Sequence, residues 1–393
     1  MPAIMMTEIP QTVQQPEDVA PDPSVELSSD LGEEPLMDDD EGAEEEKSEL
    51  ASDGLYEQQV FVADARQSLI RLDKFLLSRL SNRSRTKVQE AIRAGSVKVD
   101  DQEVKPNYKV KPGNRVSIIL PKNLDEEYDI IPQNIPLDIV YEDEDVIVVN
   151  KPYNMAVHPG VGIPDKTLVN ALAWHLQEQM EQLPVKEGNE PNRAGIVHRI
   201  DKDTTGLMVV AKNEYAMAHL ANQFFHHTIE RRYWALVWGD PSEDCGTVTG
   251  NIGRNPNDRK MFMVFPENES GKHAVTHWRV LERLYYVTLI ECRLETGRTH
   301  QIRVHMKSIG HTLFGDPRYG GNHILRGTVH TRYRQFVEGL LKQLPRQALH
   351  AKVLGFTHPR TGEHVRFESE LPKDMTAVIE RWREYVQARR QAL

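Results

Sequence analysis

Charge is distributed very unevenly along this chain, and this distribution limits which part of the chain can fold. Residues 1–53 hold 17 of the 59 acidic residues but only one of the 48 basic residues, Lys47. The rest of the chain therefore carries 42 acidic and 47 basic side chains, a net charge of +5, although the whole chain is at −11. Residues 1–56 are rich in Glu, Asp, Pro and Ser and have no apolar period, so they cannot bury enough surface to offset the entropy lost on ordering. We expect residues 1–56 to form a disordered acidic tail on a mildly basic folded body.

Several classes of protein are excluded by simple features of the 393 residues. No run of about 18 apolar residues is present, which excludes a transmembrane helix. The first residues show neither a basic start nor a long apolar stretch, so we expect no secretory signal. Two cysteines, Cys245 and Cys292, are too few for a disulfide framework or a cysteine-rich zinc site. The sequence predicts a cytoplasmic protein, and we expect a monomer without a membrane partner.

A small folded unit is predicted at 61–120, followed by a linker at 121–136. Apolar residues recur at helical spacing in two short stretches, and Ser84 can cap the second. A Lys-Pro-Gly-Asn turn separates two apolar stretches with the short length of strands. The expected helices are Arg71–Leu80 and Ser84–Ala94, and the expected strands are Val97–Val99 and Arg115–Leu120.

A larger domain is predicted at 137–393, where strand patterns outnumber helix patterns and come in runs. The expected strands are Ile139–Tyr141, Val146–Asn150, Ile196–Ile200, Leu207–Ala211, Arg232–Trp238, Ala274–Leu281, Val287–Leu294, Leu349–Phe356 and His364–Glu368. The expected helices are Thr167–Met180, one that begins after Asn213, His300–Ile309 and Asp374–Gln391. This order favours an α+β fold with a mixed, largely antiparallel sheet.

Basic residues gather on and between the two helices of the small unit, opposite their apolar positions. They are Arg79, Arg83, Arg85, Lys87 and Arg93. A cationic helix pair suits a phosphate backbone, although a solvated basic face explains the charge equally well. The segment RLDKFLLSRLSNRSRTKVQEAIRAGSVKVDDQEV and the following KVKPGNRVSI also resemble the S4 RNA-binding domain over nearly its whole length. The resemblance implies that these helices dock on structured RNA.

The segment Arg193–Ala211 concentrates ionisable groups between two apolar stretches. His198, Arg199 and Asp201 lie in it, followed by Lys202 and Asp203. A carboxylate beside cations stays ionised at neutral pH because positive charge lowers its pKa. Asp201 can therefore serve as a nucleophile or a base, although Asp-Lys-Asp-Thr-Thr-Gly is also a good surface turn.

Several long motifs of the larger domain resemble one known family in the right order. HRIDKDTTGLMVVAKN resembles the catalytic motif of the RluA-type pseudouridine synthases, with Asp201 at the position of the catalytic aspartate. VIVVNKPYNMAVHPG, ERRYWALVWG, LETGRTHQIRVHMKSIGHTLFGDPRYGG and LHAKVLGFTHP resemble the other motifs. The resemblance spans about 60–390, and the S4 domain that precedes it is most similar to the subfamily that acts on the large ribosomal subunit. The long acidic tail departs from the family's usual short N-terminus.

The resemblance implies two further catalytic residues, and some ionisable residues of the same domain are candidates for RNA contact. Tyr233 lies at the family's active-site tyrosine, where its ring can stack on a base and its hydroxyl can move a proton. Arg303 lies at the family's basic residue, which pairs with the catalytic aspartate, and Arg298 in the same motif is a competing choice. Further candidates for RNA contact in this domain are His198, Arg199, Lys151 and Arg298.

The reaction implied by the resemblance is an isomerisation of uridine in structured RNA, the substrate being large-subunit ribosomal RNA. It involves no redox change and loses no atoms, so we expect no cofactor and no metal. The histidines give no metal motif, because His300 and His305 are five residues apart and off one helical face. A non-catalytic RNA-binding or ribosome-assembly factor is the rival hypothesis, and it predicts loss of Asp201 or Tyr233. A glycoside hydrolase is a third, but it needs a second carboxylate in less basic surroundings.

Overall fold

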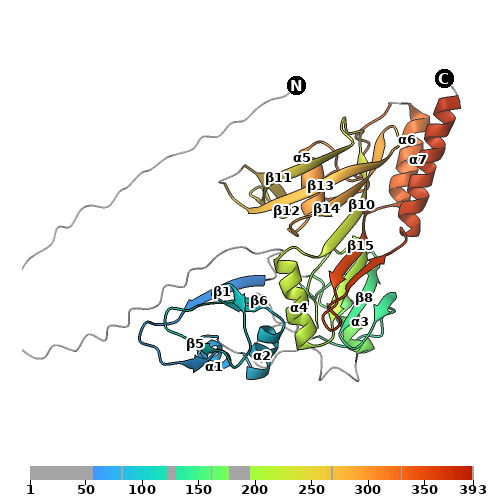
Figure 1. Cartoon of the computed structure of the whole chain (residues 1–393). Coiled ribbons are helices and arrows are strands. Elements are labelled where there is room, and N and C mark those ends of the chain that lie inside the picture. Colours follow the sequence, from blue (N-terminus) through green and yellow to red (C-terminus); the bar gives the residue numbers. More distant parts are fainter. Residues whose placement is uncertain are drawn as a thin grey trace, which may run out of the picture. The chain divides into compact units, whose positions relative to one another are not determined.

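The computed structural model describes residues 56–80, 83–121, 130–160, 162–176, 195–266, 269–328 and 330–391 (Figure 1). The predicted acidic tail lies outside the described residues except for Tyr56. Part of the predicted linker, 122–129, and the end of the predicted helix Thr167–Met180 also lie outside them. Within the described residues, no helix is both long and apolar enough to cross a membrane.

The small unit is a sheet of short strands packed on two helices. The strands are β1 (Tyr56–Val62), β2 (Ile70–Arg71), β3 (Val97–Val99), β4 (Gln102–Glu103), β5 (Lys109–Val110) and β6 (Arg115–Pro121). The helices are α1 (Leu72–Leu77) and α2 (Arg85–Arg93). The sheet runs in the order β1-β6-β3-β4, while β2 and β5 form a separate ribbon. The first ordered strand begins at Tyr56 instead of near 61, because β1 pairs along the whole of β6.

The apolar positions that predicted the two helices form the core of the small unit. Phe75, Leu76, Val88 and Ile92 are all buried there together with strand residues. The Ser84 side chain accepts a hydrogen bond from the backbone N–H of Lys87, which confirms it as the cap of α2.

The larger domain is built on a ten-stranded sheet in the order β12-β11-β13-β14-β10-β15-β9-β8-β7, with β16 beside β15. Its strands are β7 (Ile139–Glu142), β8 (Val146–Lys151), β9 (Thr205–Ala211), β10 (Glu230–Trp238), β11 (Cys245–Asn255), β12 (Asp258–Phe265), β13 (Lys272–Arg283), β14 (Val287–Leu294), β15 (Leu349–Thr357) and β16 (His364–Glu368). Among the described strands the pairing is antiparallel except between β15 and β9. The mixed, largely antiparallel α+β class is thus confirmed.

Helices cover this sheet and bury its apolar side chains. They are α3 (Leu168–His175), α4 (Glu214–Phe225), α5 (Gln301–Ser308), α6 (Thr331–Gln343) and α7 (Lys373–Gln391). Helices α6 and α7 lie side by side and share a core with Trp238 and Trp382 (Figure 1). A second core lies around Phe224 of α4, and a third contains Tyr233 and Leu172. Ile130 and Ile135 pack against this third core, so part of the predicted linker belongs to the domain.

Two differences from the expected elements have clear physical reasons. Residues 196–200 form no strand, because Ile196 makes a single bridge to Val210 and the rest of this apolar run is buried without a ladder. Helix α6 and the hairpin of β11 and β12 were not expected. In α6 three buried residues, Tyr333, Val337 and Leu340, stand among many charged ones, so the apolar stripe is narrow.

Candidate active site

Asp201 lies in the loop before β9, at a point where two strands approach closely. The backbone of Gly206 has a φ of 114°, a conformation that side-chain-bearing residues rarely adopt. A Cβ on Gly206 would lie 2.3 Å from the carbonyl oxygen of Ala351 in β15, so only glycine fits here. The parallel pairing of β9 with β15, at Thr205–His350, begins beside this glycine. The local sequence Thr-Thr-Gly therefore fixes the end of the loop that carries Asp201.

Arg303 of α5 connects Asp201 to a second carboxylate. Its Nη1 donates to Oδ2 of Asp201 at 2.8 Å, while its Nε and Nη2 donate to the two oxygens of Asp316 at 2.7 and 2.9 Å. Asp316 is completely buried and also accepts the backbone N–H groups of Arg318 and Tyr319. Such a bidentate pair fixes the plane of the guanidinium and hence the position of the nitrogen that holds Asp201.

The charges around Asp201 keep it ionised. Burial alone would raise its pKa, but the guanidinium groups of Arg303 and Arg199 outweigh burial and hold the pKa of Asp201 below its ordinary value. Burial works against the charge of Arg303 in the same way, yet Asp316 and Asp201 raise the pKa of Arg303 above its ordinary value. The Asp201 side chain is 23% exposed, so this ionised group remains accessible.

A cleft opens over Asp201. Its walls include Arg199, Arg231, Tyr233, Arg298, His300 and Arg303. Tyr233 comes from β10, which lies next to β15 in the sheet. The cleft thus brings together one accessible carboxylate, the ring of Tyr233 and several cations, a combination that suits a substrate with a flat base and a phosphate backbone.

The sequence left open whether Arg298 or Arg303 pairs with Asp201, and the geometry favours Arg303. The Nε of Arg298 donates to the carbonyl oxygen of His273 at 3.0 Å instead. Arg298 and the exposed Arg199 still line the cleft, as expected for candidates that contact the substrate.

Two predicted RNA contacts, Lys151 and His198, are corrected by the structure because both are buried. Lys151 is 1% exposed, and its Nζ donates to the carbonyl oxygens of Pro152, Met155 and Lys202. Burial lowers the pKa of Lys151 to about 7. His198 stacks on Phe224, and its Nε2 accepts the backbone N–H of Val209. Neither side chain faces a surface on which RNA could lie. Through its bond to the carbonyl oxygen of Lys202, Lys151 instead stabilises the loop that carries Asp201.

The basic residues of the small unit form ion pairs on its surface. Arg85 pairs with Asp73, Lys87 with Glu214 and Arg93 with Glu90, while Arg79 lies over the ring of Phe75. The guanidinium of Arg93 is 53% exposed, and surface pairs such as Arg93–Glu90 are weak, at roughly 0–1 kcal/mol, so a phosphate can compete for it. Arg83 is half-buried beside them. These five side chains therefore remain candidates for backbone contact.

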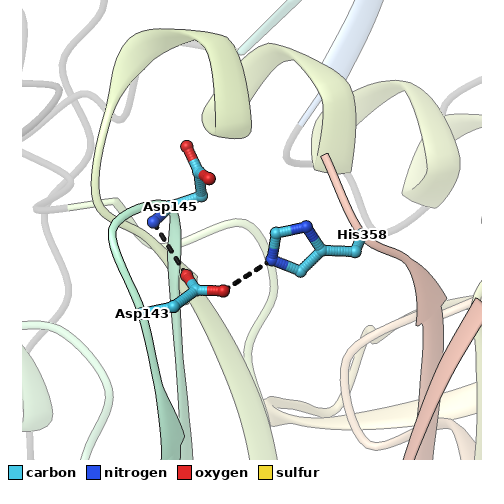
Figure 2. A group of neighbouring side chains, drawn as sticks. All are labelled: Asp143, Asp145 and His358. Carbon is cyan, nitrogen blue, oxygen red and sulfur yellow. Dashed lines mark hydrogen bonds and ion pairs between the residues drawn. The ribbon is translucent and has the colours of Figure 1, made fainter. Parts of the chain in front are cut away.

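A group far from Asp201 in sequence, Asp143, Asp145 and His358, has the spacing of metal ligands (Figure 2). Arg360 already donates to both oxygens of Asp145, at 2.5 and 2.9 Å. Asp143 accepts His358 and the backbone N–H groups of Asp145 and Val146. Because the Arg360 guanidinium supplies the positive charge here, we interpret the cluster as a structural contact that links the β7–β8 turn to the segment after β15.

Comparison with known proteins identifies the family. The model of the RNA pseudouridylate synthase family matches residues 145–308, and that of the S4 domain matches residues 70–116. The chain is 47% identical over 321 residues to an uncharacterized RNA pseudouridine synthase, YlyB, of Bacillus subtilis, covering 82% of this chain and 97% of that protein. The chain belongs to the RNA pseudouridine synthase family. It is therefore an isomerase that acts on RNA and carries an S4 domain.

Other members of the family are similar over nearly the same range. A ribosomal large subunit pseudouridine synthase D of Zymomonas mobilis is 45% identical, covering 78% of this chain and 91% of that protein. RNA pseudouridine synthase 2, chloroplastic, of Arabidopsis thaliana is 40% identical, covering 81% of each chain.

Three residues in or behind this synthase's cleft were not predicted as site residues from the sequence: Arg231 lines it, while Asp316 and Tyr319 contact its residues Arg303 and His300. Asp316 and Tyr319 belong to the quoted stretch FGDPRYGG, and their polar side chains between glycines were the available signal. Arg231 directly precedes the predicted strand Arg232–Trp238 and is buried, with its guanidinium 5.4 Å from the ring of Phe224. Arg231 and its neighbours in the cleft are brought together only by folding, so no spacing in the sequence could reveal that Arg231 lines the cleft.

Proposed function

We propose that this synthase isomerises specific uridines of large-subunit ribosomal RNA, with Asp201 as the catalytic carboxylate. The observation that carries the proposal is the ion pair of Asp201 with Arg303 in a cleft that also contains Tyr233. The substrate class is supported by relatives of Zymomonas mobilis and Vibrio parahaemolyticus, which are named ribosomal large subunit pseudouridine synthase D.

The target uridine has to leave its stack to reach Asp201, at a cost of about a few kcal/mol. Contacts of the S4 domain and of the basic cleft with the RNA backbone can offset this cost. The C1′–N1 bond then breaks, the base rotates, and C5 bonds to C1′. The hydrogen lost from C5 is balanced by the one gained at N1, so the product has the composition of the substrate.

Asp201 acts at the sugar in one of two ways. It attacks C1′ as a nucleophile, or it removes a sugar proton so that a glycal-like intermediate forms. Either role needs an ionised oxygen, and Arg303 binds Oδ2 while Oδ1 makes no hydrogen bond to another described residue. Arg303 thus orients the carboxylate and leaves one oxygen available.

Tyr233 is proposed to stack on the displaced base and to help remove the proton from C5. Its ring forms part of the cleft wall and is otherwise buried among apolar residues, so it offers a flat apolar face. We further propose that the synthase acts as a monomer in the cytoplasm, on free RNA or on an assembling ribosomal particle.

The proposal is tested by mapping pseudouridine in ribosomal RNA from cells with and without the gene. We expect a small number of large-subunit positions to lose pseudouridine and to regain it when the wild-type gene is restored. The purified protein should modify the same positions in an unmodified transcript of that RNA. Small-subunit and transfer RNA transcripts serve as controls, and modification confined to them would contradict the proposed substrate.

A further inference from the structure

His300 lies in the cleft beside Asp201 in an unusual backbone conformation. Its φ is 58°, the left-handed region, which a non-glycine residue adopts only when its surroundings require it. The side chain is 12% exposed and forms part of the cleft wall. Strain of this kind accumulates at functional sites, so the contacts that hold the ring are informative.

One side of the imidazole is fixed by Tyr319. The Nδ1 of His300 lies 2.8 Å from the hydroxyl oxygen of Tyr319, and the backbone N–H of Phe262 donates to that same oxygen at 3.1 Å. The hydroxyl proton has no other acceptor among the described residues, and leaving it unpaired in the interior would be costly. Tyr319 therefore donates to Nδ1. A neutral imidazole that accepts at Nδ1 carries its hydrogen at Nε2.

The protonation states agree with this arrangement. Burial raises the pKa of Tyr319 to about 12, so its hydroxyl keeps its proton at neutral pH. Burial lowers the pKa of His300 to about 4, so its ring is neutral. The ring is thus held as the Nε2–H tautomer.

The Nε2–H group of His300 faces the reacting carboxylate without bonding to it. Nε2 lies 3.9 Å from Oδ1 of Asp201, which is longer than a hydrogen bond. It makes no hydrogen bond to any other residue in the part of the chain that the structure describes. A donor of fixed orientation is therefore available in the cleft next to the oxygen that acts on the sugar.

We propose that His300 is a further catalytic residue, whose Nε2–H donates a hydrogen bond to the uracil while it is detached from the sugar. This inference rests on the proposed function. When the C1′–N1 bond breaks, its electron pair goes to N1 and the charge spreads over the carbonyl oxygens of the base. A preorganised N–H donor at such an oxygen stabilises the anion.

A neutral imidazole suits this step better than an imidazolium. An imidazolium could give its proton to N1, and the protonated base would lose the electron density with which C5 attacks C1′. A neutral N–H group stabilises the anion but keeps its proton, as other enzymes use a neutral histidine at a developing oxyanion. The anion then forms the C5–C1′ bond, C5 loses its proton, and N1 gains one.

The test compares His300→Ala and His300→Gln in single-turnover reactions on unmodified large-subunit ribosomal RNA transcripts. Removing one donor of this type lowers the rate by about 100-fold or more, so we expect that loss in His300→Ala. RNA affinity should stay nearly unchanged. The amide of His300→Gln can supply an N–H donor and should restore part of the rate. His364→Ala, at an exposed histidine of β16, is the matched control and should react at the wild-type rate.

A second transcript, made with 5-fluorouridine, separates a catalytic role from a structural one. Fluorine stabilises the detached anion, so the loss caused by His300→Ala should be clearly smaller on this RNA than on the uridine transcript. Because C5 then carries fluorine and has no proton to lose, the rate on this RNA is followed as the disappearance of 5-fluorouridine and not as pseudouridine formation. Tyr319→Phe removes the bond that fixes the tautomer. Tyr319→Phe alone should react about tenfold more slowly than the wild-type protein. Combined with His300→Ala, it should lower the rate no further than His300→Ala does alone, because both substitutions act through the His300 ring.

The outcomes separate this inference from the proposed function. If the wild-type protein forms no pseudouridine on the large-subunit transcript, the proposed function is wrong. If wild-type protein is active but His300→Ala reacts equally fast, or loses the same factor on both transcripts, His300 is not the donor to the base. Independent, multiplicative losses from His300→Ala and Tyr319→Phe would also overturn the inference.

Discussion

Two carboxylates held by arginine, one in each folded region of this synthase, differ in how many of their hydrogen-bonding positions remain available. Asp73 in the S4 domain is 0% exposed and accepts Arg71 and the backbone N–H of Lys74 on one oxygen. Its other oxygen accepts Arg71, Arg85 and Gln89. Asp201 in the synthase domain accepts Arg303 on one oxygen, and its other oxygen only faces His300 at 3.9 Å.

This comparison distinguishes a structural carboxylate from a reactive one. Both are ionised, because arginine lowers the pKa of each. Asp73 has no capacity left for another partner, so its charge can only stabilise the fold. Asp201 keeps an accessible oxygen at a cleft, so its charge can act on a substrate. Ionisation alone therefore does not mark an active site; incomplete hydrogen bonding in an accessible cleft does.

The largest effect is expected for Asp201→Asn. The amide keeps the shape but is neither nucleophile nor base, so the single-turnover rate should fall by at least about 1000-fold. Stability should change little, because Arg303 remains bound to Asp316. Pseudouridine formation by mass spectrometry and thermal unfolding measure the two quantities. Near-normal product formation would remove Asp201 from the chemistry.

Asp73→Asn should give the opposite pattern. Asp73 is buried and accepts hydrogen bonds from the part-exposed Arg71 and Arg85, so weakening a charge-assisted bond should cost about 1.5–3 kcal/mol and the S4 domain should unfold at lower urea concentration. The rate on RNA that is already bound should be unchanged. If Asp73→Asn is as stable as the wild-type protein but reacts slowly, Asp73 is not a purely structural carboxylate and the contrast with Asp201 is wrong.

The same contrast has a pH dependence of known sign. The pKa of Asp73 is lowered, chiefly by its hydrogen bonds to Arg71, so the carboxylate contributes stability above its unfolded value near 3.9. That contribution is lost as the pH falls further. The difference in unfolding free energy between wild type and Asp73→Asn should therefore shrink from pH 5 to pH 3.

A smaller effect is expected for Arg93→Gln on the surface of the S4 domain. Its guanidinium is 53% exposed and pairs with Glu90, so a phosphate can take it over. Affinity for RNA should fall a few-fold, and the salt dependence should become shallower by about one unit of log slope. Arg334→Gln, at an exposed arginine paired with Glu338 on α6, is the matched control. An equal slope in both variants would argue against RNA contact at Arg93.

The smallest effect is expected on deleting residues 1–53. They carry 17 acidic residues and one basic residue, so they can compete with phosphates for a body of net charge +5. Deletion should tighten binding of random RNA more than of cognate RNA at low salt. The difference should disappear near 1 M salt, where the Debye length is about 3 Å. Equal affinities for random RNA at low salt would leave this segment without a role in binding.

Much of this fold could be predicted from the sequence, because local patterns of apolar and capping residues determine where many of its strands and helices lie. The strands β14 and β16 and the caps Ser84 and Asn213 are found as expected. The hairpin of β11 and β12 was missed, since its partly exposed strands contain glycines and polar residues and lack a clear alternation.

The candidate site also contains residues that the sequence could predict and features that it could not. Asp201, Tyr233 and Arg303 come from separate motifs, and they line one cleft as the family resemblance implies. The polarity of Lys151 and His198 suggested RNA contact, but burial depends on packing between distant segments, which no local pattern reports. The tautomer of His300 likewise depends on Tyr319 and on the backbone of β12, far along the chain.

The parallel pairing of β9 with β15 has a consequence for how the protein is made. β9 follows the loop of Asp201 directly, but its neighbour β15 is synthesised much later, since Thr205 and His350 are 145 residues apart. While the chain is still growing, that edge of β9 has no partner and the loop of Asp201 has no fixed end. The enzyme therefore acquires its activity late, when translation of its own message is nearly finished.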